Sequence, residues 1–136
     1  MKVISSILFT RGDFFMIKCA IVGATGVVGR TFLKVLEERN LNIDEYVLLA
    51  SSKSKGKKIM NKEYEIEELT DKSFDNKRFD YALFSAGGQI SKKFSPIAAK
   101  NGCTVIDNSS AFRMKDDVPL VVPEVNIERA YENNGI

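Results

Sequence analysis

The fold of this chain is decided by the stretch Met16-Ile17-Lys18-Cys19-Ala20-Ile21-Val22-Gly23-Ala24-Thr25-Gly26-Val27-Val28-Gly29. Residues 16–22 form an almost continuous apolar run, which is typical of a strand buried on both faces of a parallel sheet. Three glycines follow, and apolar residues then recur at helical spacing. A strand, a glycine-rich turn and a helix in this order predict an α/β fold with a mostly parallel, doubly wound sheet.

Each of the three positions in the turn requires glycine for a different physical reason. Gly23 allows a sharp turn after the strand, Gly26 leaves room for a pyrophosphate, and Gly29 lets the helix press against the strand. The helix then presents free N–H groups and the positive end of its dipole to an anion. The pattern predicts a Rossmann-like dinucleotide site, although three glycines can also mark a purely structural turn. The residues of this turn that are predicted to bind the cofactor are Gly23, Thr25, Gly26, Val27, Val28 and Gly29.

The helix after the turn is amphipathic. The apolar positions that we expect to face the sheet are Val28, Phe32, Val35 and Leu36. Charged residues on the other side are Arg30, Lys34, Glu37 and Glu38.

The second predicted strand, residues 46–50, indicates which dinucleotide is bound. Enzymes that prefer NAD place an acidic residue at the end of this strand, where it binds the ribose 2′-hydroxyl. This chain has none there, and the strand runs into Ser51-Ser52-Lys53-Ser54-Lys55-Gly56-Lys57-Lys58. Hydroxyl and ammonium groups suit a 2′-phosphate, so we predict NADP(H). The alternative is a solvated basic loop.

Length and composition limit the other possibilities. The chain has 136 residues, 44% of them hydrophobic, which suffices for one globular core. A net charge of +2 is too small for a nucleic-acid footprint, and no segment approaches the roughly 20 apolar residues that span a bilayer. We therefore expect no nucleic-acid or membrane partner, and no metal ion. Two cysteines, Cys19 and Cys103, suit a reducing cytoplasm.

The predicted domain covers residues 16–136. Residues 1–15 do not fit it, and we expect a disordered extension or the product of an upstream start codon.

Strands and helices alternate in the rest of the chain. Residues 64–67 predict an edge strand, and residues 79–84 predict a strand that ends in a small-residue turn, where ligands bind in open parallel sheets. Ser85, Ala86 and Gly87 of this turn are predicted to contact the cofactor. Ser95 and Pro96 favour the first turn of a helix, which could also begin near residue 91. Residues 103–107 predict a further strand, and the proline-containing run 118–123 an edge or irregular strand.

Five stretches resemble the amino-terminal half of bacterial aspartate-semialdehyde dehydrogenase. They are residues 22–29, 49–54, 84–88, 105–113 (Val-Ile-Asp-Asn-Ser-Ser-Ala-Phe-Arg) and 119–126 (Pro-Leu-Val-Val-Pro-Glu-Val-Asn). The last two stretches are the most specific. The resemblance implies NADPH-dependent reductive dephosphorylation of L-aspartyl 4-phosphate, on the route to lysine, methionine and threonine.

The resemblance also implies roles for single residues. Arg113 matches the arginine that binds the substrate phosphate, and Asn108 matches an asparagine near the phosphate and nicotinamide. Ser51, Lys53 and Ser54 match the 2′-phosphate contacts. Arginine is more usual at the position of Lys53, so weaker discrimination against NAD is expected.

The residues that carry the family's chemistry are not found in this sequence. The family's cysteine nucleophile follows an Asn-Gly-Ile, with which this sequence stops, and the chain contains no histidine. We therefore expect an incomplete, inactive enzyme, whose full-length form is a homo-oligomer. Two alternatives are a short-chain-dehydrogenase relative and a non-catalytic NADP-sensing module. The first is disfavoured because no tyrosine has a lysine four residues later.

Overall fold

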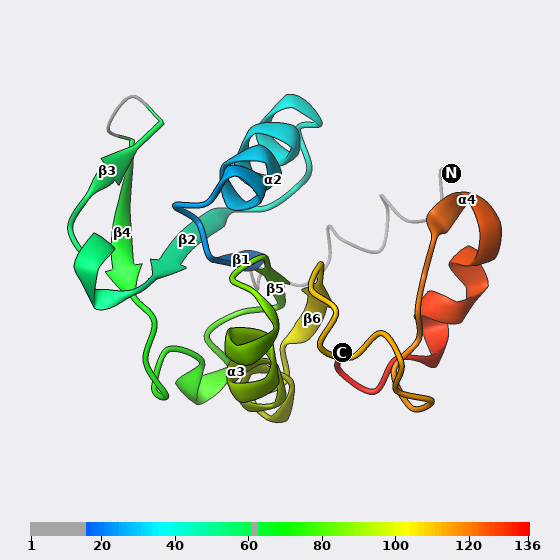
Figure 1. Ribbon diagram of the computed structural model, residues 1–136. Coiled ribbons are helices and arrows are strands. Elements are labelled where there is room, and N and C mark those ends of the chain that lie inside the picture. Colours follow the sequence, from blue (N-terminus) through cyan, green and yellow to red (C-terminus); the bar gives the residue numbers. More distant parts are fainter. Residues whose placement is uncertain (1–15, 61–62) are drawn as a thin grey trace, which may run out of the picture.

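The computed structural model describes residues 16–60 and 63–136 and contains one open sheet with helices on both faces (Figure 1). The strands are β1 (Lys18–Val22), β2 (Glu45–Ala50), β3 (Lys58–Ile59), β4 (Tyr64–Glu68), β5 (Tyr81–Phe84) and β6 (Thr104–Asp107). The helices are α2 (Val27–Glu38), α3 (Gly88–Lys100) and α4 (Pro123–Asn126). The extension expected over residues 1–15 lies outside the described residues. Within the described ranges, no helix is long and apolar enough to cross a membrane.

The strand order is β3-β4-β2-β1-β5-β6, and every pairing is parallel except that of β3 with β4. This topology confirms the predicted mostly parallel, doubly wound sheet. The chain leaves β1 toward β2 on one side and later returns to β5 on the other. The glycine turn after β1 therefore lies at the point where the strand order reverses, which is where such sheets bind ligands.

Two apolar clusters hold the layers together, one on each face of the sheet. Ile21 of β1 belongs to the cluster that includes Leu33 of α2, whereas its neighbour Val22 belongs to the cluster that includes Phe94 and Ala98 of α3. Side chains that alternate between two covered faces explain why β1 reads as a continuous apolar run. Figure 1 shows α2 and α3 on opposite faces of the central strands.

The predicted buried face of α2 was partly wrong. Leu33 is fully buried, whereas Val28 and Val35 are 40% and 42% exposed. Phe32 and Leu36 pack at the margin of the cluster. The sheet contacts the helix along the line of Gly29 and Leu33, which are its buried residues, so the stripe that faces the sheet is narrower than the apolar pattern indicates.

Three other predictions need correction. The strand at residues 64–68 is an inner strand, because the two-residue β3 covers its outer side. Helix α3 begins at Gly88, which is close to the alternative start near residue 91, and Pro96 lies inside it. Ser95 is fully buried inside the helix and does not lie at its start. The helix extends further toward the N-terminus because residues before Pro96, such as Phe94, pack on the sheet. Residues 118–122 form no strand and lead into α4.

Candidate functional site

The glycine turn is held in place by its two neighbouring strands. Gly23 has φ +84°, a conformation that favours glycine, and its N–H donates to the Leu49 carbonyl at 2.9 Å. A Cβ atom added at Gly23 would lie 2.8 Å from the Ala86 nitrogen. The turn after β1 is therefore packed directly against the turn after β5, with no space for a side chain between them.

Gly29 and Gly26 differ in what surrounds them. A Cβ atom at Gly29 would overlap the Gly23 carbonyl oxygen and lie 2.8 Å from the Ala24 Cα. At Gly26 the nearest protein atom would be that same carbonyl oxygen at 3.4 Å. The protein thus closes the space at Gly29 and leaves it open at Gly26, as a pyrophosphate approaching the backbone requires.

The residues around Gly26 are accessible from solvent. Gly26 is the residue before α2, the first turn of which contains no acidic side chain. Val27 is 84% exposed, and Thr25 is half-buried. An anion at this helix start would meet free N–H groups and no repelling carboxylate from that turn.

The small-residue turn after β5 lies beside the glycine turn. Both the N–H and the hydroxyl of Ser85 donate to the Val22 carbonyl, at 2.9 and 3.2 Å. Ala86 is half-buried, whereas Gly87 is exposed with φ +89°. Helix α3 begins at Gly88, so both helix starts and both turns lie at the carboxyl edge of the sheet.

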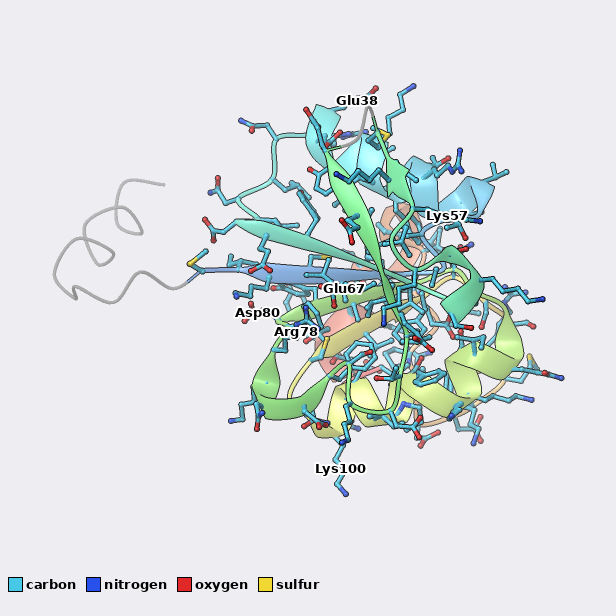
Figure 2. All side chains as sticks on the ribbon, turned by 90° about the vertical axis from the view of Figure 1, so that its left-hand side faces the viewer. Glu38, Lys57, Glu67, Arg78, Asp80 and Lys100 are labelled. Carbon is cyan, nitrogen blue, oxygen red and sulfur yellow. The ribbon has the colours of Figure 1, made fainter. Side chains whose placement is uncertain are left out.

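The basic loop after β2 lies at the same edge. Ser51 and Lys53 are exposed, and Ser54 is half-buried. Two backbone hydrogen bonds of 2.9 Å attach the loop to β4: Gly56 donates to Ile66, and Ile66 donates to Lys57. Figure 2 shows Lys57 toward the carboxyl ends of the central strands and Arg78 and Asp80 toward their amino ends.

Asn108 and Arg113 line a common cavity in the segment after β6. The Asn108 N–H donates to the Phe84 carbonyl at 3.0 Å, so the backbone at Asn108 stays fastened to β5. Both residues line a cavity of about 540 Å³ formed by residues from 104 to 136, with Leu120 and Ile136 among its apolar walls. The glycine turn contributes nothing to its lining. The structure therefore brings Asn108 and Arg113 together, but in a cavity beside the edge strand β6.

A hydrogen-bond network around Asp107 was missed by the sequence analysis. The Asp107 carboxylate accepts from the Ser91 hydroxyl at 2.9 Å and from the Ser109 N–H and hydroxyl, both at 2.8 Å. Asp-x-Ser after a strand is typical of a side-chain-capped turn, so the Ser109 bonds could have been predicted. The bond from Ser91 could not, because Ser91 belongs to another element.

Neither thiol of the chain is suited to nucleophilic attack. Cys19 and Cys103 are both buried, and burial raises the pKa of each to about 12. The reactive thiolate is therefore scarce at neutral pH, and protein atoms shield it from substrates.

Comparisons with known proteins agree on one family. Residues 18–133 match the family described as semialdehyde dehydrogenase, NAD binding domain. The aspartate-semialdehyde dehydrogenase of Aquifex aeolicus is 58% identical over 123 residues, which are 88% of this chain and 36% of that protein. That of Bacillus subtilis is 50% identical over 119 residues, which are 86% of this chain and 34% of that protein.

Solved structures agree with these matches. Aspartate-semialdehyde dehydrogenase II of Vibrio cholerae, complexed with ASA, has a TM-score of 0.79 and 49% identity, over 86% of this chain and 35% of that one. The Candida albicans enzyme with NADP has a TM-score of 0.72 and 28% identity, over 85% of this chain and 36% of that one. The chain spans about a third of the length of these relatives. The matches do not favour the short-chain-dehydrogenase or NADP-sensing alternatives.

Proposed function

The chain belongs to the semialdehyde dehydrogenase family, whose NAD-binding domain it contains, and from this premise we propose that it is the NADP(H)-binding part of an aspartate-semialdehyde dehydrogenase. The proposed reaction is NADPH-dependent reduction of L-aspartyl 4-phosphate to L-aspartate 4-semialdehyde with release of phosphate, in the biosynthesis of lysine, methionine and threonine. Relatives with 50% and 58% identity are named as this enzyme.

One structural observation carries the cofactor proposal. The Gly23 N–H donates to the Leu49 carbonyl, and the Ser85 N–H donates to the Val22 carbonyl. These hydrogen bonds bring the turns after β1, β2 and β5 together at one edge of the sheet. The open space at Gly26 fits a pyrophosphate. The exposed Ser51 and Lys53 fit a 2′-phosphate, because a hydroxyl can donate a hydrogen bond to it and an ammonium group supplies opposite charge.

The residues have separate tasks toward NADPH. Backbone N–H groups at Val27 and Val28 would hold the pyrophosphate beside Gly26, whose own N–H donates to the Gly23 carbonyl at 3.0 Å. Ser51, Lys53 and Ser54 would hold the 2′-phosphate. Thr25 and the turn Ser85-Ala86-Gly87 would border the rest of the cofactor. When bound, NADPH supplies the hydride. The chain orients the cofactor with backbone groups that packing already holds in place.

Arg113 is the proposed anchor for the substrate phosphate, with Asn108 beside it. A guanidinium group can bind a phosphate through two parallel hydrogen bonds. Both residues line the same cavity, which would place the acyl phosphate near the end of β6. The substrate partner is thus a small phosphorylated molecule.

The isolated chain is proposed to bind the cofactor without turning over substrate. Acyl transfer to an enzyme thiol needs an accessible thiolate and a group that accepts its proton. Cys19 and Cys103 are buried, and the sequence has no histidine. Turnover therefore needs residues that this sequence does not supply. For the complete enzyme we propose a cytoplasmic homo-oligomer.

Titration calorimetry tests the cofactor proposal. NADPH should bind more tightly than NADH, because the basic loop attracts the additional phosphate. Equal affinities would contradict the NADP preference, and failure to bind either dinucleotide would contradict the cofactor role.

A further inference from the structure

An acidic residue lies beside the basic loop although none occupies the end of β2. Glu68 is the last residue of β4, and in the parallel pairing of β4 with β2 it lies opposite Ala50. Ala50 immediately precedes Ser51, the first residue of the loop. The neighbouring strand therefore brings a carboxylate to the edge of the sheet where a 2′-phosphate would bind.

Glu68 interacts with this loop. Its carboxylate lies 3.8 Å from the ammonium group of Lys55, and the two side chains are 36% and 67% exposed, respectively. Backbone hydrogen bonds from Gly56 to Ile66 and from Ile66 to Lys57 hold the loop against β4 independently of this ion pair. An exposed ion pair at this distance adds little stability, so its main effect is on local charge.

The preceding residue, Glu67, is placed differently from Glu68. Glu67 lies opposite Leu49 in the same pairing, and successive strand residues point to opposite faces. Its two carboxylate oxygens each accept a 3.0 Å hydrogen bond from Arg78. In Figure 2 Arg78 lies toward the amino ends of the central strands and Lys57 toward their carboxyl ends. The charge of Glu67 is therefore directed away from the basic loop.

We propose that Glu68 is a specificity-determining residue whose negative charge limits the preference of the site for NADP(H) over NAD(H); this rests on the proposed cofactor function. The carboxylate neutralises one of the four lysines of the loop and repels a 2′-phosphate of about −1.5 to −2 charges. It has no such effect on the uncharged 2′-hydroxyl of NAD(H). Discrimination thus depends on a repelling group as well as on attracting ones.

The central comparison of the test is between three forms of the 136-residue chain. They are the wild type, Glu68→Gln, and the control Glu45→Gln, which also loses one negative charge and an ion pair with a lysine. Glu45 pairs with Lys18 at 2.7 Å at the other end of the strands. Titration calorimetry with NADPH and NADH gives the ratio of the two dissociation constants for each form.

Glu68→Gln should raise the ratio of Kd for NADH to Kd for NADPH about two- to fivefold at low salt, and the rise should shrink as salt increases. Glu45→Gln should leave the ratio unchanged. Glu68→Asp, which keeps the charge, should behave like the wild type. Lys55→Gln should lower the ratio, because Glu68 then keeps its charge without its counter-ion.

An unchanged ratio in Glu68→Gln, or an equal rise in Glu45→Gln, overturns the role of Glu68. If Glu68→Gln does not fold, an unchanged ratio in Lys55→Gln overturns it. Equal affinities of the wild type for both cofactors contradict the proposed NADP preference instead. In that case a higher ratio of Kd for NADH to Kd for NADPH in Glu68→Gln than in the wild type still supports the role of Glu68.

Discussion

The Ser91 hydroxyl donates a 2.9 Å hydrogen bond to the Asp107 carboxylate, and this bond joins the buried face of α3 to the end of β6. Ser91 is fully buried. The same carboxylate accepts two bonds from Ser109, whose hydroxyl oxygen in turn accepts from the Ala111 N–H at 3.1 Å. Helix α3 therefore helps to hold in place the segment that runs from Asn108 toward Arg113.

Ser91→Ala should lower the free energy of unfolding by about 1–3 kcal/mol, because the Asp107 carboxylate loses a buried donor. Ser95 of the same helix is an unusually close control: it is also fully buried, but its hydroxyl has no hydrogen-bond partner among the described residues. Ser95→Ala should be neutral or slightly stabilising. Urea denaturation measures both, and equal losses would show that the bond to Asp107 contributes nothing.

Lys53→Glu should narrow or reverse the preference for NADPH, because an attraction to the 2′-phosphate becomes a repulsion. The expected loss of NADPH affinity is about 1–3 kcal/mol, with little change for NADH. Lys100→Glu is a control with the same change of charge, because Lys100 is the last residue of α3 and the helix starts at the edge of the sheet where the cofactor would bind. Equal losses in the two variants would mean that Lys53 acts only through net charge.

Gly29→Ala should destabilise the chain by about 1–3 kcal/mol or more, because the added Cβ meets backbone that cannot move away. Gly88→Ala is the matched control, since a Cβ there has no neighbour within 4 Å and alanine favours a helix. Thermal unfolding compares them. A Gly29→Ala variant with wild-type stability would show that the turn and α2 are not as closely packed as described.

The two thiols should react slowly with alkylating reagents in the native chain, even near pH 9, and rapidly in denaturant. Burial raises the pKa of Cys19 and of Cys103 from 9.0 to about 12. Because the folded pKa exceeds the unfolded one, their contribution to stability is complete below pH 9 and is lost as pH rises toward 12. Mass spectrometry of alkylation over time checks this, and fast native labelling would contradict burial.

Arg113→Lys, made in a longer protein that includes the catalytic residues, should lower kcat/KM for aspartyl phosphate while leaving the Kd for NADPH nearly unchanged. An ammonium group keeps the charge but not the two-point hydrogen bonding of a guanidinium group. Steady-state kinetics beside calorimetry measures the two effects. Unchanged kinetics would show that Arg113 is not the phosphate anchor.

Much of the fold can be predicted from residues 16–29, because the needs of a tight strand-to-helix turn are local. Gly23 needs a positive φ and Gly29 must lack a side chain, and the apolar run before them requires two covered faces. The starting point of α3 was less predictable, since the local signal of Ser95 and Pro96 competes with packing of the helix on the sheet. For such a segment, burial of an apolar face outweighs a single proline.

The sequence by itself determined the type of fold, the position of the glycine turn and the basic character of the loop after the second strand. Adjacent residues carry each of these features, so no distant contact is needed to predict them. Only the tertiary structure decided that Glu68 lies opposite Ala50 and that Ser91 reaches Asp107. These pairs are 18 and 16 residues apart in the sequence, and they meet because of which strands become neighbours and which face each helix covers.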